Sequence, residues 1–185
     1  AGGVQLLRWL VGQLEQEGFP FRSRCDTEVL LQGFRHWGQD VWARLNGIFA
    51  AACWETGSRR LTLARDRFGV KPLLLQRDRD GRCAFASELS ALQASGCIGV
   101  PRIHHHALES YRLWGAIASP LSLIEGIESL PAGHTAVREK DGTWDVQAFT
   151  AQAPISTSPE SWTLASATTA VGDALELAVA RQSIG

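Results

Sequence analysis

Residues 65–73 read Arg65-Asp-Arg-Phe-Gly-Val-Lys-Pro-Leu73 and form a charged stretch between two apolar runs, Leu61-Thr-Leu-Ala64 and Leu73-Leu-Leu-Gln76. Gly69 and Pro72 are residues that favour turns. Such runs repeat at short intervals along the chain, and Thr56-Gly-Ser and Asp80-Gly81 are placed as hairpin turns, which predicts antiparallel sheet. The stretch therefore predicts a turn inside a β-sheet core. Charges at such turns usually form modest ion pairs, so we interpret Arg65, Asp66 and Lys71 as structural.

The rest of the sequence surrounds this turn with further strands and with helices. An apolar run from Gly47 to Trp54 is typical of a strand covered on both faces. Apolar residues at helical spacing run from Leu6 to Leu14, with Gly18 placed as a C-terminal cap, and Asp26 is placed to cap a second helix. The other expected strands are 83–86, 135–138 and 143–149, and the other expected helices are 88–94, 107–113 and 171–181. Helices at the start followed by strands predict an α+β fold.

Composition excludes several classes of partner and site. The 185 residues carry a formal charge of -1, with 45% hydrophobic and 20% charged residues, which argues against a nucleic-acid groove or a membrane patch. No apolar run approaches the roughly 20 residues of a membrane-spanning helix, and no export signal is recognised, so the cytoplasm is the expected location. The four cysteines lack metal-ligand spacing and are expected to be buried thiols. We expect no metal site, and interpret His104-His-His106 as a surface run.

Several motifs occur in an order and spacing that resembles one known family. They are Phe21-Arg-Ser-Arg-Cys-Asp-Thr-Glu-Val-Leu-Leu31, Leu45-Asn-Gly-Ile-Phe-Ala50, residues 65–73, Phe85-Ala-Ser-Glu88 and Leu130-Pro-Ala-Gly-His134. Together they resemble the glutamine-hydrolysing domain of asparagine synthetases, a class II glutamine amidotransferase, over about the first 150 residues.

The resemblance implies a fold, a domain layout and a chemistry. The implied fold is that of an N-terminal-nucleophile hydrolase, with two stacked antiparallel β-sheets between helical layers (αββα), followed by the start of an α/β ATP-dependent synthetase domain. The implied layout is an amidotransferase domain over residues 1–149 that lacks its N-terminal part, a linker over 150–163, and the first helix of the synthetase domain over 164–185. In such enzymes an N-terminal cysteine hydrolyses glutamine, and the ammonia amidates aspartate in a reaction that uses ATP and Mg²⁺ in the second domain. A homodimer is also compatible with the resemblance.

The resemblance assigns two glutamine-binding positions within this sequence. The family uses the aspartate at the position of Asp26 to bind the α-ammonium of glutamine, a role that suits an acceptor-only carboxylate. Gly2 fits the family's oxyanion and substrate loop, whereas Ala1 and Gly3 lack its asparagine and carboxylate. Arg65, Asp66, Gly69 and Lys71 match a motif that shapes the domain. No catalytic residue is assigned, because the nucleophilic cysteine is not in this sequence.

Three interpretations of function stay open. The first is an inactive fragment of a glutamine-dependent asparagine synthetase, since there is no methionine and a helical pattern runs up to the last residues. The second, supported by Ala1 and Gly3, is the scaffold domain of a relative with a degenerate glutaminase site, such as a β-lactam synthetase or a lasso-peptide cyclase. The third is a phosphoribosyl or fructose-6-phosphate amidotransferase, which the combined motifs resemble less.

Overall fold

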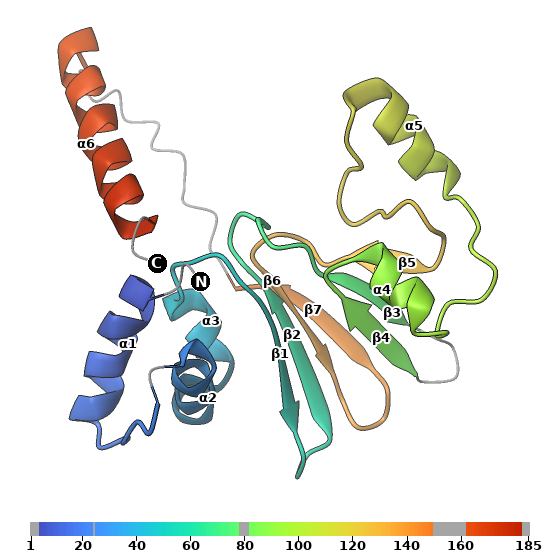
Figure 1. Ribbon diagram of the computed structural model, residues 1–185, viewed down its shortest axis with the longest axis horizontal. Coiled ribbons are helices and arrows are strands. Elements are labelled where there is room, and N and C mark those ends of the chain that lie inside the picture. The colour runs from blue at the N-terminus through green and yellow to red at the C-terminus, as the bar shows by residue number, and fades with distance from the viewer. Residues whose placement is uncertain (1–3, 24, 78–81, 150–161, 183–185) are drawn as a thin grey trace. The chain divides into compact units, whose positions relative to one another are not determined.

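The computed structural model describes residues 4–23, 25–77, 82–149 and 162–182 (Figure 1). The chain divides into two compact units. One comprises residues 1–47 together with 151–185, and the other comprises residues 48–150. Each unit is described by itself.

The first unit is helical. It contains α1 (Val4–Gln16), α2 (Asp26–Trp37), a 3-10 turn η1 (Gly38–Asp40), α3 (Val41–Arg44) and α6 (Leu164–Gln182). Helix α1 packs against α2, and the Leu10 and Leu14 side chains are buried. The predicted cap at Gly18 is confirmed, because Gly18 has φ +86° and the Phe19 N–H donates to the Leu14 carbonyl at 2.9 Å. A left-handed glycine with this bond is a common way for a helix to end.

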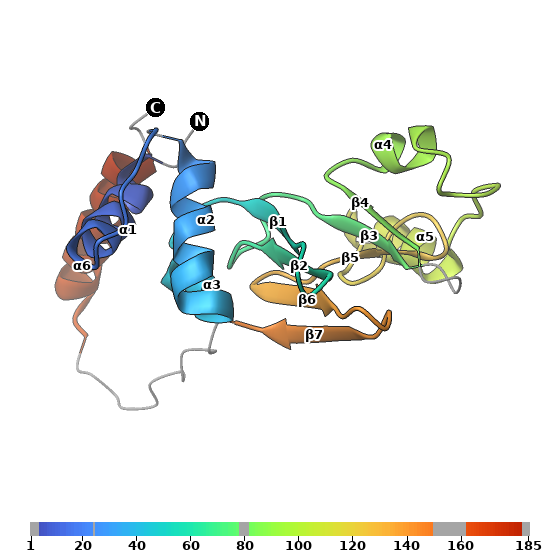
Figure 2. The same ribbon diagram turned by 90° about the horizontal axis from the view of Figure 1, so that it is seen from below.

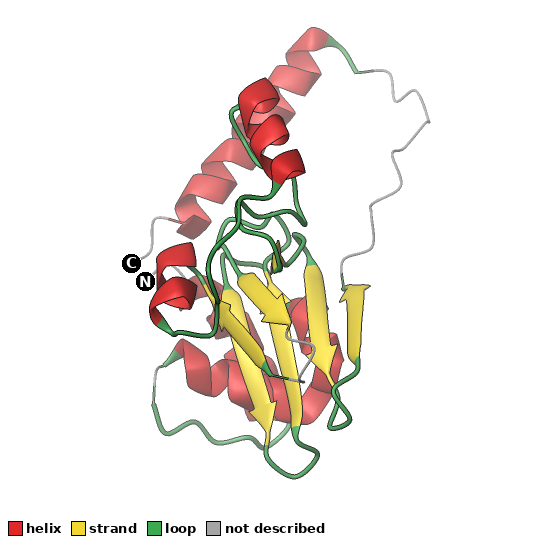
Figure 3. Ribbon diagram, turned by 90° about the vertical axis from the view of Figure 1, so that its right-hand side faces the viewer, coloured by secondary structure: helices red, strands yellow, loops and turns green. Residues whose placement is uncertain are grey.

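The second unit contains two antiparallel sheets. The four-stranded sheet has the order β1-β2-β6-β7, and the three-stranded sheet has the order β4-β3-β5. Figure 3 shows these strands in yellow. Their bounds are β1 (Ala50–Glu55), β2 (Arg60–Arg65), β3 (Leu74–Arg77), β4 (Cys83–Ala86), β5 (Ile127–Ser129), β6 (His134–Arg138) and β7 (Trp144–Ala148). The predicted α+β class and the paired antiparallel sheets are confirmed.

Leucines that alternate along the strands build the core between the two sheets. Leu61 and Leu63 of β2 pack with Leu75 of β3 and with Ala136 of β6, so residues of both sheets share one buried cluster. Each fully buried leucine stabilises the fold by about 1.5–3 kcal/mol. Because side chains alternate along a strand, Leu74 faces the other way from Leu75.

The opposite face of the three-stranded sheet is covered by α4 (Leu89–Ala94) (Figure 2). Leu92 of this helix is buried with Ile124 and Ile127, and Leu74 packs against the same cluster. The second unit therefore has three layers: the four-stranded sheet, the three-stranded sheet and α4. Helix α5 (His105–Trp114) follows and ends at Gly115, which is left-handed and donates to the Tyr111 carbonyl at 2.8 Å.

Strand β1 differs from its prediction. The sequence indicated coverage on both faces, but the alternate residues Ala52 and Trp54 are exposed, with the Trp54 side chain 55% exposed, so one face of β1 is not covered. The three alanines of this strand, residues 50–52, present little apolar surface, so partial exposure to water costs little. None of the helices in the described ranges combines the length and hydropathy of a membrane span. The predicted linker, 150–163, lies almost wholly outside the described residues. The domain boundaries, and the assignment of α6 to a second domain, stay predictions.

Candidate functional site

Asp26 is the first residue of α2 and is exposed to solvent. The N-cap is Cys25, in extended backbone and without a side-chain capping bond, so the expectation that Asp26 caps the helix is wrong by one residue. Within the described part of the chain, no hydrogen bond to the Asp26 carboxylate is found. A carboxylate in the first turn interacts favourably with the positive end of the helix dipole. Asp26 is therefore a charged acceptor open to a ligand.

Glu28 organises the segment that leads into this helix. Its carboxylate accepts the backbone N–H of Arg22 at 2.9 Å, the backbone N–H of Ser23 at 2.7 Å and the Ser23 hydroxyl at 2.5 Å. The Ser23 hydroxyl and the Arg22 N–H stabilise the charged form, and so lower the pKa of Glu28. No role for Glu28 was predicted from the sequence. The available signal was a glutamate three residues after the N-cap, the spacing of a capping box.

The turn between β2 and β3 is built around the buried carboxylate of Asp66, which is 1% exposed. One oxygen, Oδ1, accepts the N–H groups of Phe68 at 3.1 Å and Val70 at 3.0 Å. The other, Oδ2, accepts the N–H of Lys71 at 2.9 Å. A buried carboxylate requires such partners, because an unpaired charge in the interior is very unfavourable. The arrangement makes Asp66 the internal template of the turn.

Arg65 fixes the same turn from the other side. Its guanidinium donates to the carbonyls of Lys71 at 2.8 Å and Gly69 at 2.7 Å, and to the Leu130 carbonyl at 2.7 Å and the Ser129 hydroxyl at 2.9 Å. The planar group with five donors suits this divergent pattern, which a lysine could not reproduce. Arg65 thus joins two motifs that lie more than sixty residues apart in the sequence.

Gly69 has a conformation and surroundings that only glycine satisfies. Its φ is +63°, and an added Cβ would lie 3.0 Å from the Ala132 Cβ and 3.0 Å from the Arg65 Cζ. The Lys71 side chain is exposed, so its contribution to the turn comes through its backbone. The structure therefore brings Arg65, Asp66, Gly69 and Lys71 together as one hydrogen-bonded turn. Asp26 belongs to the other unit, and Gly2, like Ala1 and Gly3, lies outside the described residues.

The cysteines are less buried than predicted from the sequence. Cys25 and Cys97 are exposed, which corrects that expectation, and Cys53 and Cys83 are partly buried. Cys25 is the N-cap of α2, and the neighbouring Thr27 hydroxyl and backbone N–H lower the pKa of its exposed thiol. Burial raises the pKa of Cys53 to about 11 and also raises the pKa of Cys83. The four thiols therefore differ in reactivity, since the thiolate is the reactive form.

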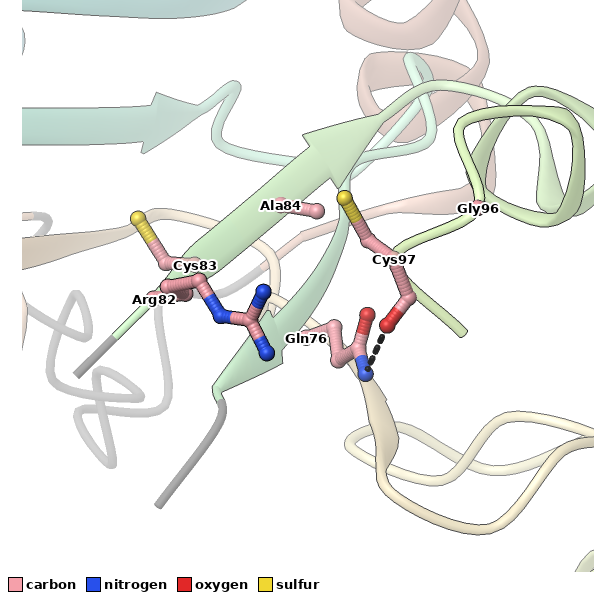
Figure 4. Close-up of a pocket in the computed structure, with 6 residues that line it drawn as sticks. All are labelled: Gln76, Arg82, Cys83, Ala84, Gly96 and Cys97. Atoms are coloured by element: carbon pink, nitrogen blue, oxygen red, sulfur yellow. Dashed lines mark hydrogen bonds between the residues drawn. The ribbon is translucent and has the colours of Figure 1, made fainter. Parts of the chain in front are cut away.

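A small hollow lies over β3 and β4 and is lined by Gln76, Arg82, Cys83, Ala84, Gly96 and Cys97 (Figure 4). Gln76 Nε2 donates to the Cys97 carbonyl at 3.0 Å across it. The Sγ atoms of Cys83 and Cys97 do not point toward one another (Figure 4).

Across the described ranges, no group of three or more His, Cys, Asp or Glu side chains could hold a metal ion. In the histidine run, His106 Nδ1 lies 3.3 Å from a carboxylate oxygen of Glu109.

Comparison with known proteins identifies the domain. The sequence profile of the glutamine amidotransferase domain matches residues 7–150. The chain belongs to this family. It is 35% identical over 119 residues to a putative glutamine-hydrolysing asparagine synthetase of Mycobacterium tuberculosis, a match that covers 64% of this chain and 18% of the relative. It is 33% identical over 141 residues to the glutamine-hydrolysing asparagine synthetase 3 of Bacillus subtilis, covering 73% of this chain and 23% of the relative. The sequence-based resemblance to asparagine synthetases is confirmed.

A solved structure shows the same fold in another glutamine amidotransferase. The amidotransferase domain resembles the glutamine phosphoribosylpyrophosphate amidotransferase of Bacillus subtilis with a TM-score of 0.51 and 20% sequence identity, over 78% of this chain and 27% of that chain. The predicted N-terminal-nucleophile-type fold is therefore confirmed. The chain spans about a fifth of the length of the curated relatives quoted above.

Proposed function

We propose that this amidotransferase domain binds glutamine through Asp26 and serves as the glutaminase part of a glutamine-dependent asparagine synthetase. The observation that carries the proposal is the exposed Asp26 carboxylate at the N-terminus of α2, to which the described residues donate no hydrogen bond. The relatives named as glutamine-hydrolysing asparagine synthetases support it. An acceptor-only carboxylate forms short, charge-assisted hydrogen bonds with an ammonium group.

The complete proposed reaction requires groups beyond this sequence. An N-terminal cysteine thiolate would attack the side-chain amide of glutamine, and the backbone around Gly2 would help to stabilise the oxyanion. The ammonia would amidate aspartate in a synthetase domain that binds ATP and Mg²⁺. The complete enzyme would be cytoplasmic and could form a homodimer. Within this chain, the part assigned to Asp26 is to orient glutamine by its α-ammonium.

Titration calorimetry with glutamine tests the binding role directly. Asp26→Ala should weaken glutamine binding by about 10- to 100-fold, because a hydrogen bond to a charged group contributes roughly 1.5–3 kcal/mol. Asp40→Ala is a matched control, since Asp40 is an exposed aspartate of the same unit. Equal affinity of wild type and Asp26→Ala would refute the assignment. In the longer protein, replacing the terminal cysteine by alanine should abolish glutamine-dependent synthesis and leave ammonia-dependent synthesis intact.

A second candidate is a scaffold domain without glutaminase activity, as in the relatives with a degenerate site. The feature in its favour is that Ala1 and Gly3 stand where the resemblance implies the asparagine and the carboxylate of the family's substrate loop. Loss of one oxyanion donor typically lowers the rate about a hundred- to a thousand-fold. A folded chain to which glutamine does not bind would favour the scaffold over the glutaminase.

A further inference from the structure

Glu28 and Ser23 form a short hydrogen-bonded chain that ends next to Asp26. The Glu28 carboxylate accepts three hydrogen bonds from Arg22 and Ser23. The Ser23 hydroxyl oxygen in turn accepts the N–H of Cys25 at 3.2 Å. Arg22 and Ser23 are thus tied directly to a residue in the first turn of α2, and Cys25 is tied to it through the Ser23 hydroxyl.

Asp26 has no comparable restraint of its own. Within the described ranges its side chain makes no hydrogen bond, so its direction depends on its rotamer and on the backbone at the start of the helix. Helix ends fray when their first N–H groups and the preceding segment are not held. A misplacement of about 1 Å in a binding group is enough to reduce its contribution strongly.

We propose that Glu28 is a positioning residue for glutamine, which holds Arg22, Ser23 and Cys25 so that the Asp26 carboxylate meets the α-ammonium of the substrate. This inference rests on the proposed function of Asp26. Glu28 itself does not touch glutamine in this arrangement, because its oxygens are occupied by Arg22 and Ser23. Its contribution is to the order of the segment before the helix.

The test uses calorimetric titration of the chain with two ligands, glutamine and glutaramate, which is glutamine without the α-ammonium group. Glu28→Ala should weaken glutamine binding by about tenfold, the loss expected for a displaced charge-assisted contact. Affinity for glutaramate should stay unchanged, because this ligand makes no contact with Asp26. Glu28→Gln keeps one acceptor oxygen and should remain within about threefold of wild type. Glu15→Ala, at an exposed glutamate of α1, is the control for loss of a negative charge.

Combination with Asp26→Ala separates positioning from a general effect on folding. In the Asp26→Ala background, Glu28→Ala should have no further effect on glutamine affinity, because the effects of substitutions at coupled residues on the binding free energy are not additive. Ser23→Ala is a milder substitution that removes the bridging hydroxyl, and it should weaken glutamine binding by about threefold even if Glu28→Ala fails to fold.

Two kinds of outcome overturn the inference, and they are distinguishable. If Asp26→Ala weakens glutamine binding and both Glu28→Ala and Ser23→Ala leave it unchanged, the inference fails alone. It also fails alone if Glu28→Ala weakens glutamine and glutaramate equally. If Asp26→Ala has no effect on glutamine affinity, the proposed function fails and the inference fails with it.

Discussion

Replacement of Asp66 by alanine should lower the free energy of unfolding by about 3 kcal/mol. The carboxylate accepts three backbone N–H groups, from Phe68, Val70 and Lys71, and is 1% exposed. At about 1.5 kcal/mol for each bond to a charged acceptor, the three together contribute about 4.5 kcal/mol. The Phe68 and Lys71 residues are exposed, so water can solvate part of the opened turn and the net loss is smaller.

Urea unfolding followed by circular dichroism measures this effect, with Asp66→Asn and Asp141→Ala for comparison. Asp66→Asn keeps Oδ1 but places an amide donor opposite the Lys71 N–H, so it should lose about 1.5 kcal/mol. Asp141 is exposed and accepts the Thr143 N–H at 2.9 Å, so its replacement by alanine should shift the urea midpoint much less than Asp66→Ala does. If Asp66→Ala unfolds at the same urea concentration as Asp141→Ala, the carboxylate does not template the turn.

Two further predictions concern the same turn and the cysteines. Gly69→Ala should destabilise the fold by about 1–3 kcal/mol in urea unfolding, because residue 69 has a positive φ and the new Cβ would contact Ala132. Gly115 is the control, since it has a similar φ of +67° but no atom close to the position of an added Cβ. An equal loss of stability for Gly69→Ala and Gly115→Ala would exclude the contact with Ala132 as a cause. Iodoacetamide should modify Cys25 faster than Cys53, as measured by mass spectrometry of the labelled protein. The labelling rate of Cys25 should also stop rising with pH at a lower pH than that of Cys53. Both results follow because the pKa of Cys25 is lowered and that of Cys53 is raised to about 11. Equal rates across the pH range would contradict that order.

Local patterns in the sequence were sufficient to predict most of the fold. Glycine and proline marked the turns, and short apolar runs marked the strands, so the α+β class and the neighbouring pairs β1–β2 and β3–β4 followed from local rules. The turn at residues 65–73 joins β2 and β3, which belong to different sheets, and local rules do not predict that separation. The exposure of one face of β1 could not be predicted, because an alanine-rich run is compatible with a covered and with an exposed face. Which face is covered depends on the elements that pack over the strand, and those contacts join residues distant in sequence.

The candidate site was predictable only in part, because hydrogen-bond partners are not visible in a motif. The sequence placed Asp26 at the start of a helix but assigned it the capping position that Cys25 occupies. A one-residue shift of this kind is the usual uncertainty of helix boundaries. Glu28 was missed because its partners, Arg22 and Ser23, depend on how the preceding segment folds back.

Some acidic side chains of this chain build the fold, and others are open to bind a ligand. The two kinds differ in the number of hydrogen bonds that each carboxylate accepts from the chain itself. Asp66 is buried and accepts three backbone N–H groups, so little capacity remains for a substrate. Glu28 likewise accepts three bonds from the chain itself. Asp26 is exposed at the positive end of a helix and, among the described residues, receives none. A ligand ammonium would therefore replace only water at Asp26, whereas at Asp66 it would have to displace the hydrogen bonds that hold the turn. This difference favours Asp26 over the more charged turn at residues 65–71 as the site of glutamine binding.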